Sequence, residues 1–172
     1  MTPRIVLIGV GNPWRGDDGV GRAVVEVAVD RLGPDVGYVE ADGEPGRLID
    51  AWTDADLAVV VDAVRSGAAP GTIHVWRDDT ELARTAPSTG SHALGLAEGI
   101  ALGGALHRLP KALVVSGVEV GETASGIGLS AAGAAIVEDA VGTVCGIVDE
   151  WMAAETLTQA GSKATSSPGL IE

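Results

Sequence analysis

The sequence has no phenylalanine and only one tyrosine, so bulky aromatic rings cannot fill most of its interior. Apolar residues still make up 46% of the 172 residues and charged residues only 20%, which provides enough apolar surface for a core and argues against global disorder. We therefore expect a core of closely packed Val, Ile, Leu and Ala side chains. The length suits one domain and is too short for two ordinary ones.

Cysteine is also nearly absent. Cys145 is the only one, so an internal disulfide is impossible, which fits a reducing compartment. The N-terminal segment lacks the basic region, long apolar stretch and cleavage site of a signal peptide. No uninterrupted apolar run approaches the roughly 18 residues of a membrane helix. These features predict a cytoplasmic protein without a membrane segment.

Basic residues are few. The chain has 11 Lys and Arg residues against 24 Asp and Glu residues, for a formal charge of −13. Such a surface repels a phosphate backbone and an anionic membrane, so we expect neither nucleic acid nor a membrane as a partner. A protein or a cation remains possible as a partner.

Short apolar runs alternate with amphipathic stretches along the chain. This alternation predicts an α/β domain, a three-layer sandwich with a mostly parallel, twisted sheet of about five strands flanked by helices. Long loops are expected at 78–91 and 119–129. We assign residues 1–154 to this domain and residues 155–172, which are rich in Ser, Thr and Gly, to a flexible C-terminal tail. The expected strands are 5–10, 36–41, 57–62, 72–77 and 112–118, and the expected helices are 17–32, 45–52, 92–109 and 130–152.

Three residues are candidates for chemistry because open α/β sheets bind ligands outside the carboxyl ends of their strands. Asp18 follows the first predicted strand, Asp62 closes the third, and His92 begins the helix after the first long loop. Two carboxylates and one imidazole form a mixed oxygen and nitrogen site that zinc, nickel or iron would accept. The sequence therefore predicts a small metal site at one edge of the sheet.

Each candidate also has a structural interpretation. Asp17 or Asp18 can cap the helix that follows, since carboxylates satisfy the open N–H groups of a helix start. Asp62 can hydrogen-bond the next turn, and His92 can simply begin a helix. The remaining special residues we interpret as structural: His74, His107, Cys145 and the four Trp residues.

The glycine-rich loop at 9–16 leaves an alternative function open. A dinucleotide fingerprint has the form Gly-x-Gly-x-x-Gly, but Trp14 stands at the third glycine position and Pro13 distorts the turn. The alternative to an enzyme is therefore a non-catalytic nucleotide- or metal-binding α/β module. The chain has neither a Gly-x-Ser-x-Gly nor a His-Glu-x-x-His motif, so serine hydrolases and zincins lack support.

Three motifs in register resemble those of the hydrogenase maturation proteases. They are GVGNPWRGDDGVG at 9–21, VDA at 61–63 and SHALGL at 91–96. The resemblance covers about residues 4–150 in the order and spacing of that family. It departs at Asp42-Gly43-Glu44, where the family often has Asp-Gly-Gly, which leaves the role of Asp42 open.

The resemblance implies a phosphorylase/hydrolase-like fold and an endopeptidase of aspartic or metal-assisted type. It would remove a C-terminal peptide from the nickel-loaded precursor of a nickel-iron hydrogenase large subunit. Carried over by motif, Asp18, Asp62 and His92 become both the catalytic and the metal-binding residues. Nickel would come from the precursor, with no organic cofactor, and the protease would act as a monomer. Either the metal activates a water molecule or a carboxylate acts as general base.

Overall fold

The computed structural model describes residues 2–77, 91–121 and 126–165, and only the backbone of residues 91–93 and 161–165. Among these residues, five strands form one sheet in the order β2-β1-β3-β5-β4. The first four in this order are parallel, and the edge strand β4 is antiparallel to β5. The bounds are β1 (Ile5–Val10), β2 (Val36–Ala41), β3 (Leu57–Val64), β4 (Ile73–Trp76) and β5 (Ala112–Glu119).

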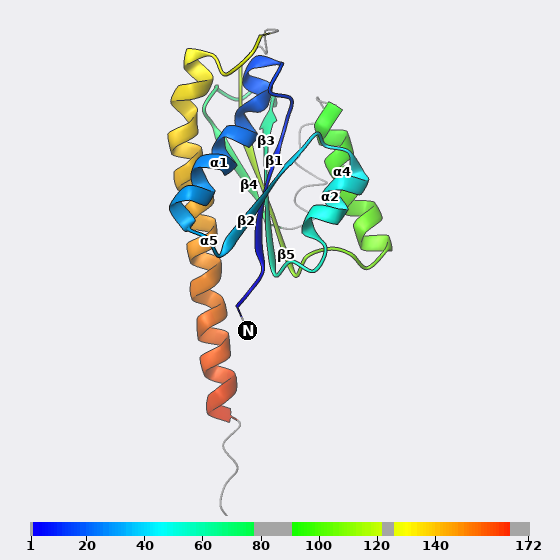
Figure 1. Cartoon of the computed structure of the whole chain (residues 1–172), viewed down its shortest axis with the longest axis vertical. Coiled ribbons are helices and arrows are strands. Elements are labelled where there is room, and N and C mark those ends of the chain that lie inside the picture. The colour runs from blue at the N-terminus through cyan, green and yellow to red at the C-terminus, as the bar shows by residue number, and fades with distance from the viewer. Residues whose placement is uncertain (1, 78–90, 122–125, 166–172) are drawn as a thin grey trace, which may run out of the picture.

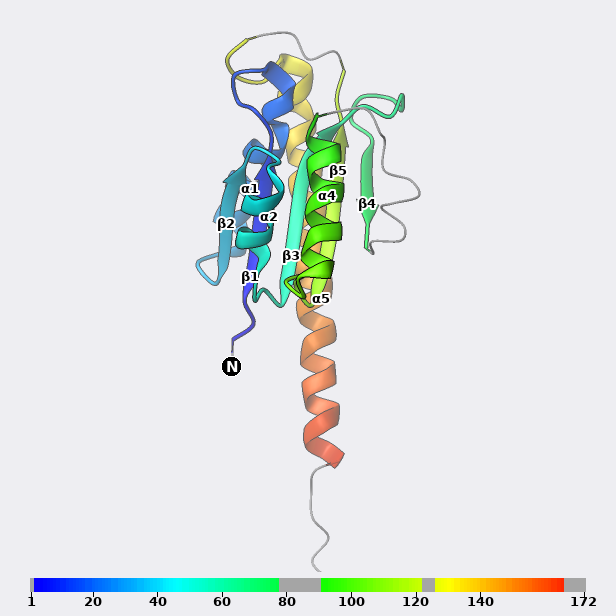
Figure 2. The same cartoon turned by 90° about the vertical axis from the view of Figure 1, so that its right-hand side faces the viewer.

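Helices cover both faces of this sheet (Figures 1 and 2). On one face lie α1 (Val20–Leu32) and α5 (Ala131–Thr165), and on the other lie α2 (Pro45–Trp52) and α4 (Ser91–Ala105). A 3-10 turn, η1 (Gly16–Gly19), links β1 to α1. The predicted three-layer α/β sandwich with a mostly parallel sheet is therefore confirmed.

The two cores follow from the alternation of side chains along each strand. Leu57, Val59 and Val61 of β3 pack into the cluster beneath α1 and α5. Ala58 and Val60 pack into the opposite cluster, beneath α2 and α4. Asp62 continues the second set, so its side chain projects toward the α2 and α4 face.

A glycine lets α1 begin directly on the ends of two strands. A Cβ atom at Gly21 would lie 2.3 Å from the carbonyl oxygen of Val61 and 2.5 Å from that of Val10. No residue other than glycine fits there without moving backbone. The close approach brings the start of α1 against the carboxyl ends of β1 and β3.

Three predicted helix boundaries are wrong. The helix expected to end at residue 109 ends earlier, since α4 ends at Ala105 and the chain turns at His107, whose φ is 55°. The helix expected to begin at Asp17 begins at Val20, because η1 turns the chain first. The last helix was expected to end at Met152 but α5 continues to Thr165 and extends beyond the sheet (Figure 1). Residues 155–165 of the predicted tail are therefore helical. Of the two predicted loops, residues 78–90 and 122–125 lie outside the described residues.

The length and composition of α5 pass a test for membrane spans. Residues Ala131–Ala160 have a mean hydropathy of 1.6 in their most apolar window, and 33% of that window is buried. The helix also buries Ala140, Val144 and Val148 against α1 and the sheet, as a core helix does. Core helices of soluble proteins pass the same test, so the match is weak evidence.

Candidate active site at the carboxyl edge of the sheet

The carboxylate of Asp18 is held where β1 ends. Its Oδ2 atom accepts a hydrogen bond from the backbone N–H of Asn12 at 3.0 Å. A Cβ atom at Gly11 would lie 2.0 Å from the carbonyl oxygen of Asp18, so only glycine allows the turn to fold back this closely. The half-buried Asp18 side chain thus has a defined place beside the first strand.

Asp62 lies close by because β1 and β3 are neighbours in the sheet. Its side chain is only 3% exposed, and η1 contacts β3. The carboxyl edge between β1 and β3 is also the topological switch point of the sheet. The helix α1 covers one face there and the helix α4 covers the other. Ligands of open α/β sheets bind at such a point. The structure therefore brings together the segments that carry two of the three predicted site residues.

His92 lies in the first turn of α4, which begins at the carboxyl end of the sheet (Figure 2). A Cβ atom at Gly95 would lie 2.0 Å from the carbonyl oxygen of Gly43, so this first turn packs tightly on the loop between β2 and α2. The imidazole of His92 is outside the described side chains. Within the described side chains, no three His, Cys, Asp or Glu residues group closely enough for a metal ion. Two carboxylates at one edge nevertheless suit a cation that is already bound by ligands of another molecule.

The interpretation of Asp17 or Asp18 as a cap of the following helix is wrong. Neither η1 nor α1 has a side-chain cap. Asp17 instead reaches Ser130, just before α5, and accepts its backbone N–H at 2.8 Å and its hydroxyl at 2.7 Å. Asp17 therefore serves the N-terminus of a helix that begins more than a hundred residues later.

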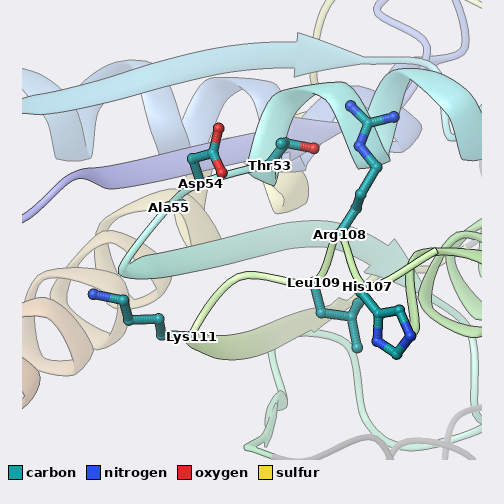
Figure 3. Close-up of a pocket in the computed structure, with 7 residues that line it drawn as sticks. All are labelled: Thr53, Asp54, Ala55, His107, Arg108, Leu109 and Lys111. Carbon is teal, nitrogen blue, oxygen red and sulfur yellow. The ribbon is translucent and has the colours of Figure 1, made fainter. Parts of the chain in front are cut away.

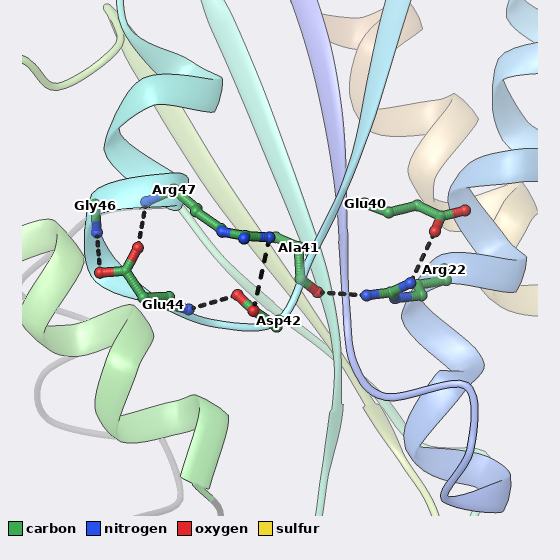
Figure 4. A network of polar contacts seen from close by, with 7 residues as sticks. All are labelled: Arg22, Glu40, Ala41, Asp42, Glu44, Gly46 and Arg47. Carbon is green, nitrogen blue, oxygen red and sulfur yellow. Dashed lines mark hydrogen bonds and ion pairs between the residues drawn. The ribbon is translucent and has the colours of Figure 1, made fainter.

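The loop between β2 and α2 forms its own polar network (Figure 4). Glu44 caps α2 by accepting the N–H groups of Gly46 at 3.0 Å and Arg47 at 2.9 Å. Asp42 accepts the N–H of Glu44 at 3.2 Å and lies 3.8 Å from the Arg47 guanidinium. The pKa of Asp42 is lowered below its ordinary value, chiefly by the hydrogen bond from the Glu44 N–H. Desolvation opposes this shift, and the charges of Arg47 and Arg22 add smaller contributions to it. The first turn of α4 packs on this loop.

Glu119 lies at the carboxyl edge of the sheet, near the candidate site, and was not among the predicted site residues. It ends β5, is 2% exposed, and accepts hydrogen bonds from Ser66 N–H at 2.7 Å, Ser66 Oγ at 2.7 Å and Gly67 N–H at 3.1 Å. His74 Nε2 lies 3.2 Å from the same carboxylate. Burial alone would raise the pKa of Glu119, but the Ser66, Gly67 and His74 hydrogen bonds outweigh it and lower the pKa. Glu119 thereby fixes the loop that follows β3, and thus the loop beyond Asp62.

The signal for Glu119 was present in the sequence. It is an acid at the end of an apolar strand, the same pattern that singled out Asp62, but the strand was expected to end one residue earlier, at Val118. The interpretation of His74 as structural agrees with its contact to Glu119 and its stacking on Trp76.

The packing role predicted for all four Trp residues is wrong for Trp14. Its side chain is 66% exposed, in the loop between β1 and η1, whereas Trp52 is fully buried. The backbone N–H of Trp14 donates to Asn12 Oδ1 at 2.9 Å, which holds the exposed indole beside the Asp18 turn. Trp14 is thus a surface residue of the candidate site.

Two hollows lie near opposite ends of the sheet. One of about 280 Å³ lies at the amino ends of β3 and β5, away from Asp18 and Asp62 (Figure 3). It is lined by Thr53, Asp54, Ala55, His107, Arg108, Leu109 and Lys111. The other, of about 230 Å³, adjoins η1 and includes Pro13, Gly16, Arg22 and Leu129. Only the second is next to the candidate site.

Together, the fold and this edge define an α/β protein that carries two acidic side chains, Asp18 and Asp62, at the carboxyl edge of a mostly parallel sheet. A family model described as hydrogenase maturation protease matches residues 28–147, which is more than half of the chain. The chain therefore belongs to the hydrogenase maturation protease family, and the resemblance seen in the three motifs is confirmed.

Individual relatives agree with this assignment. The chain is 30% identical over 150 residues to the hydrogenase 2 maturation protease of Escherichia coli (strain K12), covering 86% of this chain and 92% of the relative. It is 34% identical over 125 residues to the hydrogenase expression/formation protein HupM of Azotobacter chroococcum mcd 1, covering 70% of this chain. This chain spans only 59% of the length of that HupM protein.

Solved structures share the fold. The hydrogenase maturating endopeptidase HybD from E. coli superposes with a TM-score of 0.75 at 27% identity, over 86% of this chain and 93% of that one. The [NiFe] hydrogenase maturation protease HybD from Thermococcus kodakarensis gives a TM-score of 0.69 at 22% identity, over 82% and 96% of the two chains. The second match supports the fold alone.

Proposed function

We propose that this chain is an endopeptidase that removes a C-terminal peptide from the nickel-loaded precursor of a nickel-iron hydrogenase large subunit. One observation carries the proposal: the Asp18 turn, the strand β3 that bears Asp62 near its carboxyl end, and the first turn of α4 with His92 meet at one edge of the sheet. Family membership supports it, since the matched family and the E. coli relative are both described as maturation proteases.

In this proposal the nickel ion is part of the substrate. Asp18, Asp62 and His92 approach it with two carboxylates and an imidazole, ligand types that nickel accepts. The nearly buried Asp62 is a fixed ligand, because its strand is paired on both sides. Recognition of the ion would place the scissile peptide against the Asp18 turn.

The half-buried Asp18 is better placed than Asp62 to exchange protons with water. We assign it the role of general base. It accepts a proton from a water molecule whose oxygen attacks the scissile carbonyl carbon. The same proton then passes to the departing amine as the C–N bond breaks. In this proposal the hollow beside η1, which Pro13, Gly19 and Leu129 help to line, gives the peptide access to this side of the turn.

The compartment and the assembly are also part of the proposal. Cys145 is the sole cysteine and its thiol is free, which suits the reducing cytoplasm. A monomer would suffice, because Asp18, Asp62 and His92 all come from one chain.

Incubation of the purified chain with a nickel-loaded large-subunit precursor tests the proposal. Mass spectrometry should find a released C-terminal peptide and a correspondingly shortened precursor. Binding of the precursor without any release would instead indicate a non-catalytic metal-binding module.

A further inference from the structure

Asp17, next to the proposed general base, is a buried carboxylate whose only described role is a contact with another element. It is 7% exposed, and its two oxygens accept both donors of Ser130, at 2.8 Å and 2.7 Å. The Ser130 hydroxyl in turn accepts the N–H of Gly133 at 3.0 Å, as an N-cap of α5 does. The carboxylate thus sits at the positive end of a long helix, where a negative charge is favoured.

The backbone of α5 lies directly against this carboxylate. A Cβ atom at Gly133 would lie 2.1 Å from Asp17 Oδ1, so the helix backbone presses directly on it. A second connection runs alongside, since the N–H of Gly16 donates to the carbonyl of Gly126 at 2.8 Å. The first two residues of η1 are therefore tied to the segment that leads into α5.

Asp18 is held from the opposite side. Its carboxylate accepts the Asn12 N–H at the end of β1, while Asp17 is fixed to Ser130. Two adjacent residues in a short 3-10 turn are thus anchored to different elements. Rotation of the turn would break one anchor or the other, so the position of the Asp18 carboxylate depends on the Asp17 contact.

We infer that Asp17 and Ser130 form a clamp that positions Asp18 for its reaction, which makes Asp17 a positioning residue. The inference rests on the role proposed above for Asp18. If Asp17 and Ser130 served only as an N-cap of α5, their loss would lower stability without moving Asp18. The position of Asp18 therefore distinguishes a positioning role from a purely structural one.

The test compares Ser130→Ala with Arg31→Ala in the full chain. The first removes one hydrogen bond to Asp17. The second breaks the 2.7 Å ion pair between Arg31, in the last turn of α1, and Glu138 of α5, away from η1. Ser130→Thr keeps the hydroxyl and serves as the rescue.

Hydrogen exchange of the Asn12 amide reports on Asp18 without any metal or substrate. We expect exchange at least about tenfold faster in Ser130→Ala, and unchanged in Arg31→Ala and Ser130→Thr. With nickel-loaded precursor, kcat should fall about 10- to 100-fold in Ser130→Ala, with KM unchanged, as for groups that orient a metal ligand.

Unchanged Asn12 exchange would overturn the clamp. Faster exchange with a normal kcat would also overturn it, because the displaced turn would then not matter for the reaction. If the wild-type chain cleaves no precursor, the proposed function fails, yet the exchange data still decide whether Asp17 and Ser130 hold Asp18 in place.

Discussion

Three acidic side chains near the carboxyl edge are almost completely buried among the described residues: Asp17, Asp62 and Glu119. A buried carboxylate is costly unless it receives hydrogen bonds or meets a cation. Ser130 satisfies Asp17, and Ser66, Gly67 and His74 satisfy Glu119. These hydrogen bonds fix Asp17 and Glu119 within the fold and compensate for their burial.

Replacement of the proposed ligands should stop processing without unfolding the protein. Asp62→Asn keeps the shape but removes the charge a cation needs, and His92→Ala removes the proposed nitrogen ligand. We expect kcat/KM on nickel-loaded precursor to fall by about 100-fold or more, with a melting temperature close to that of the wild type. Asp18→Asn should behave likewise. Full activity in any of the three variants would remove that residue from the site.

Glu119→Gln tests the buried network after β3. Glutamine cannot accept all the hydrogen bonds of the carboxylate, so the free energy of unfolding should drop by about 1–3 kcal/mol at pH 7. Because the folded-state pKa of Glu119 is lowered, its stabilisation is present above the unfolded pKa and is lost as pH falls through the folded value. The stability difference between wild type and variant should therefore shrink below about pH 4. Urea unfolding across pH would show this, and a constant difference would contradict it.

Among the elements, α5 shows how the same substitution has opposite effects at two positions. Gly133→Ala should destabilise the protein by about 1–3 kcal/mol, because the added Cβ would meet the Asp17 carboxylate at 2.1 Å. Gly142→Ala on the same helix meets nothing within 4 Å and should stabilise by about 0.5–1 kcal/mol through helix propensity. Chemical denaturation of both variants measures the two signs. A stabilising Gly133→Ala would show that the contact with Asp17 is loose.

The C-terminal part of α5 is expected to be dispensable. Among the described side chains of α5, Trp151 is the last hydrophobic one that packs against the core, and Leu157 is 75% exposed. Truncation before Glu155 should change the melting temperature by no more than about 2 °C and leave processing intact. A loss of several degrees in differential scanning calorimetry would mean that residues 155–172 pack on the domain.

For the molecule as a whole, charge and an open site together favour one substrate. The formal charge of −13 repels most acidic proteins, while a nickel centre offers a cation that the acidic edge can approach. We expect little activity on casein or short peptides, cleavage of the nickel-loaded precursor, and none of the metal-free precursor. Gel assays with the two precursor forms measure this. Equal cleavage of both would refute metal sensing and leave the protease proposal standing.

Local sequence signals were enough to predict the layers of the fold and the edge that carries the candidate site. Continuous apolar runs such as 57–62 predict buried parallel strands, and Pro45 at the start of α2 places that helix correctly, because these signals are local. Asp18 and Asp62 could be chosen for the same reason: the carboxyl ends of parallel strands meet at one edge whatever the loops do.

Only the tertiary structure decided what the neighbouring residues do. Asp17 looked like a cap for the next helix, yet it binds Ser130, which lies 113 residues away in sequence. Trp14 looked like a packing residue, yet its side chain is 66% exposed. The roles of these side chains depend on which distant backbone reaches them, and no local pattern encodes that. The periodicity of a strand can be read from consecutive residues. The partner of a buried carboxylate is determined only when the layers of the fold assemble.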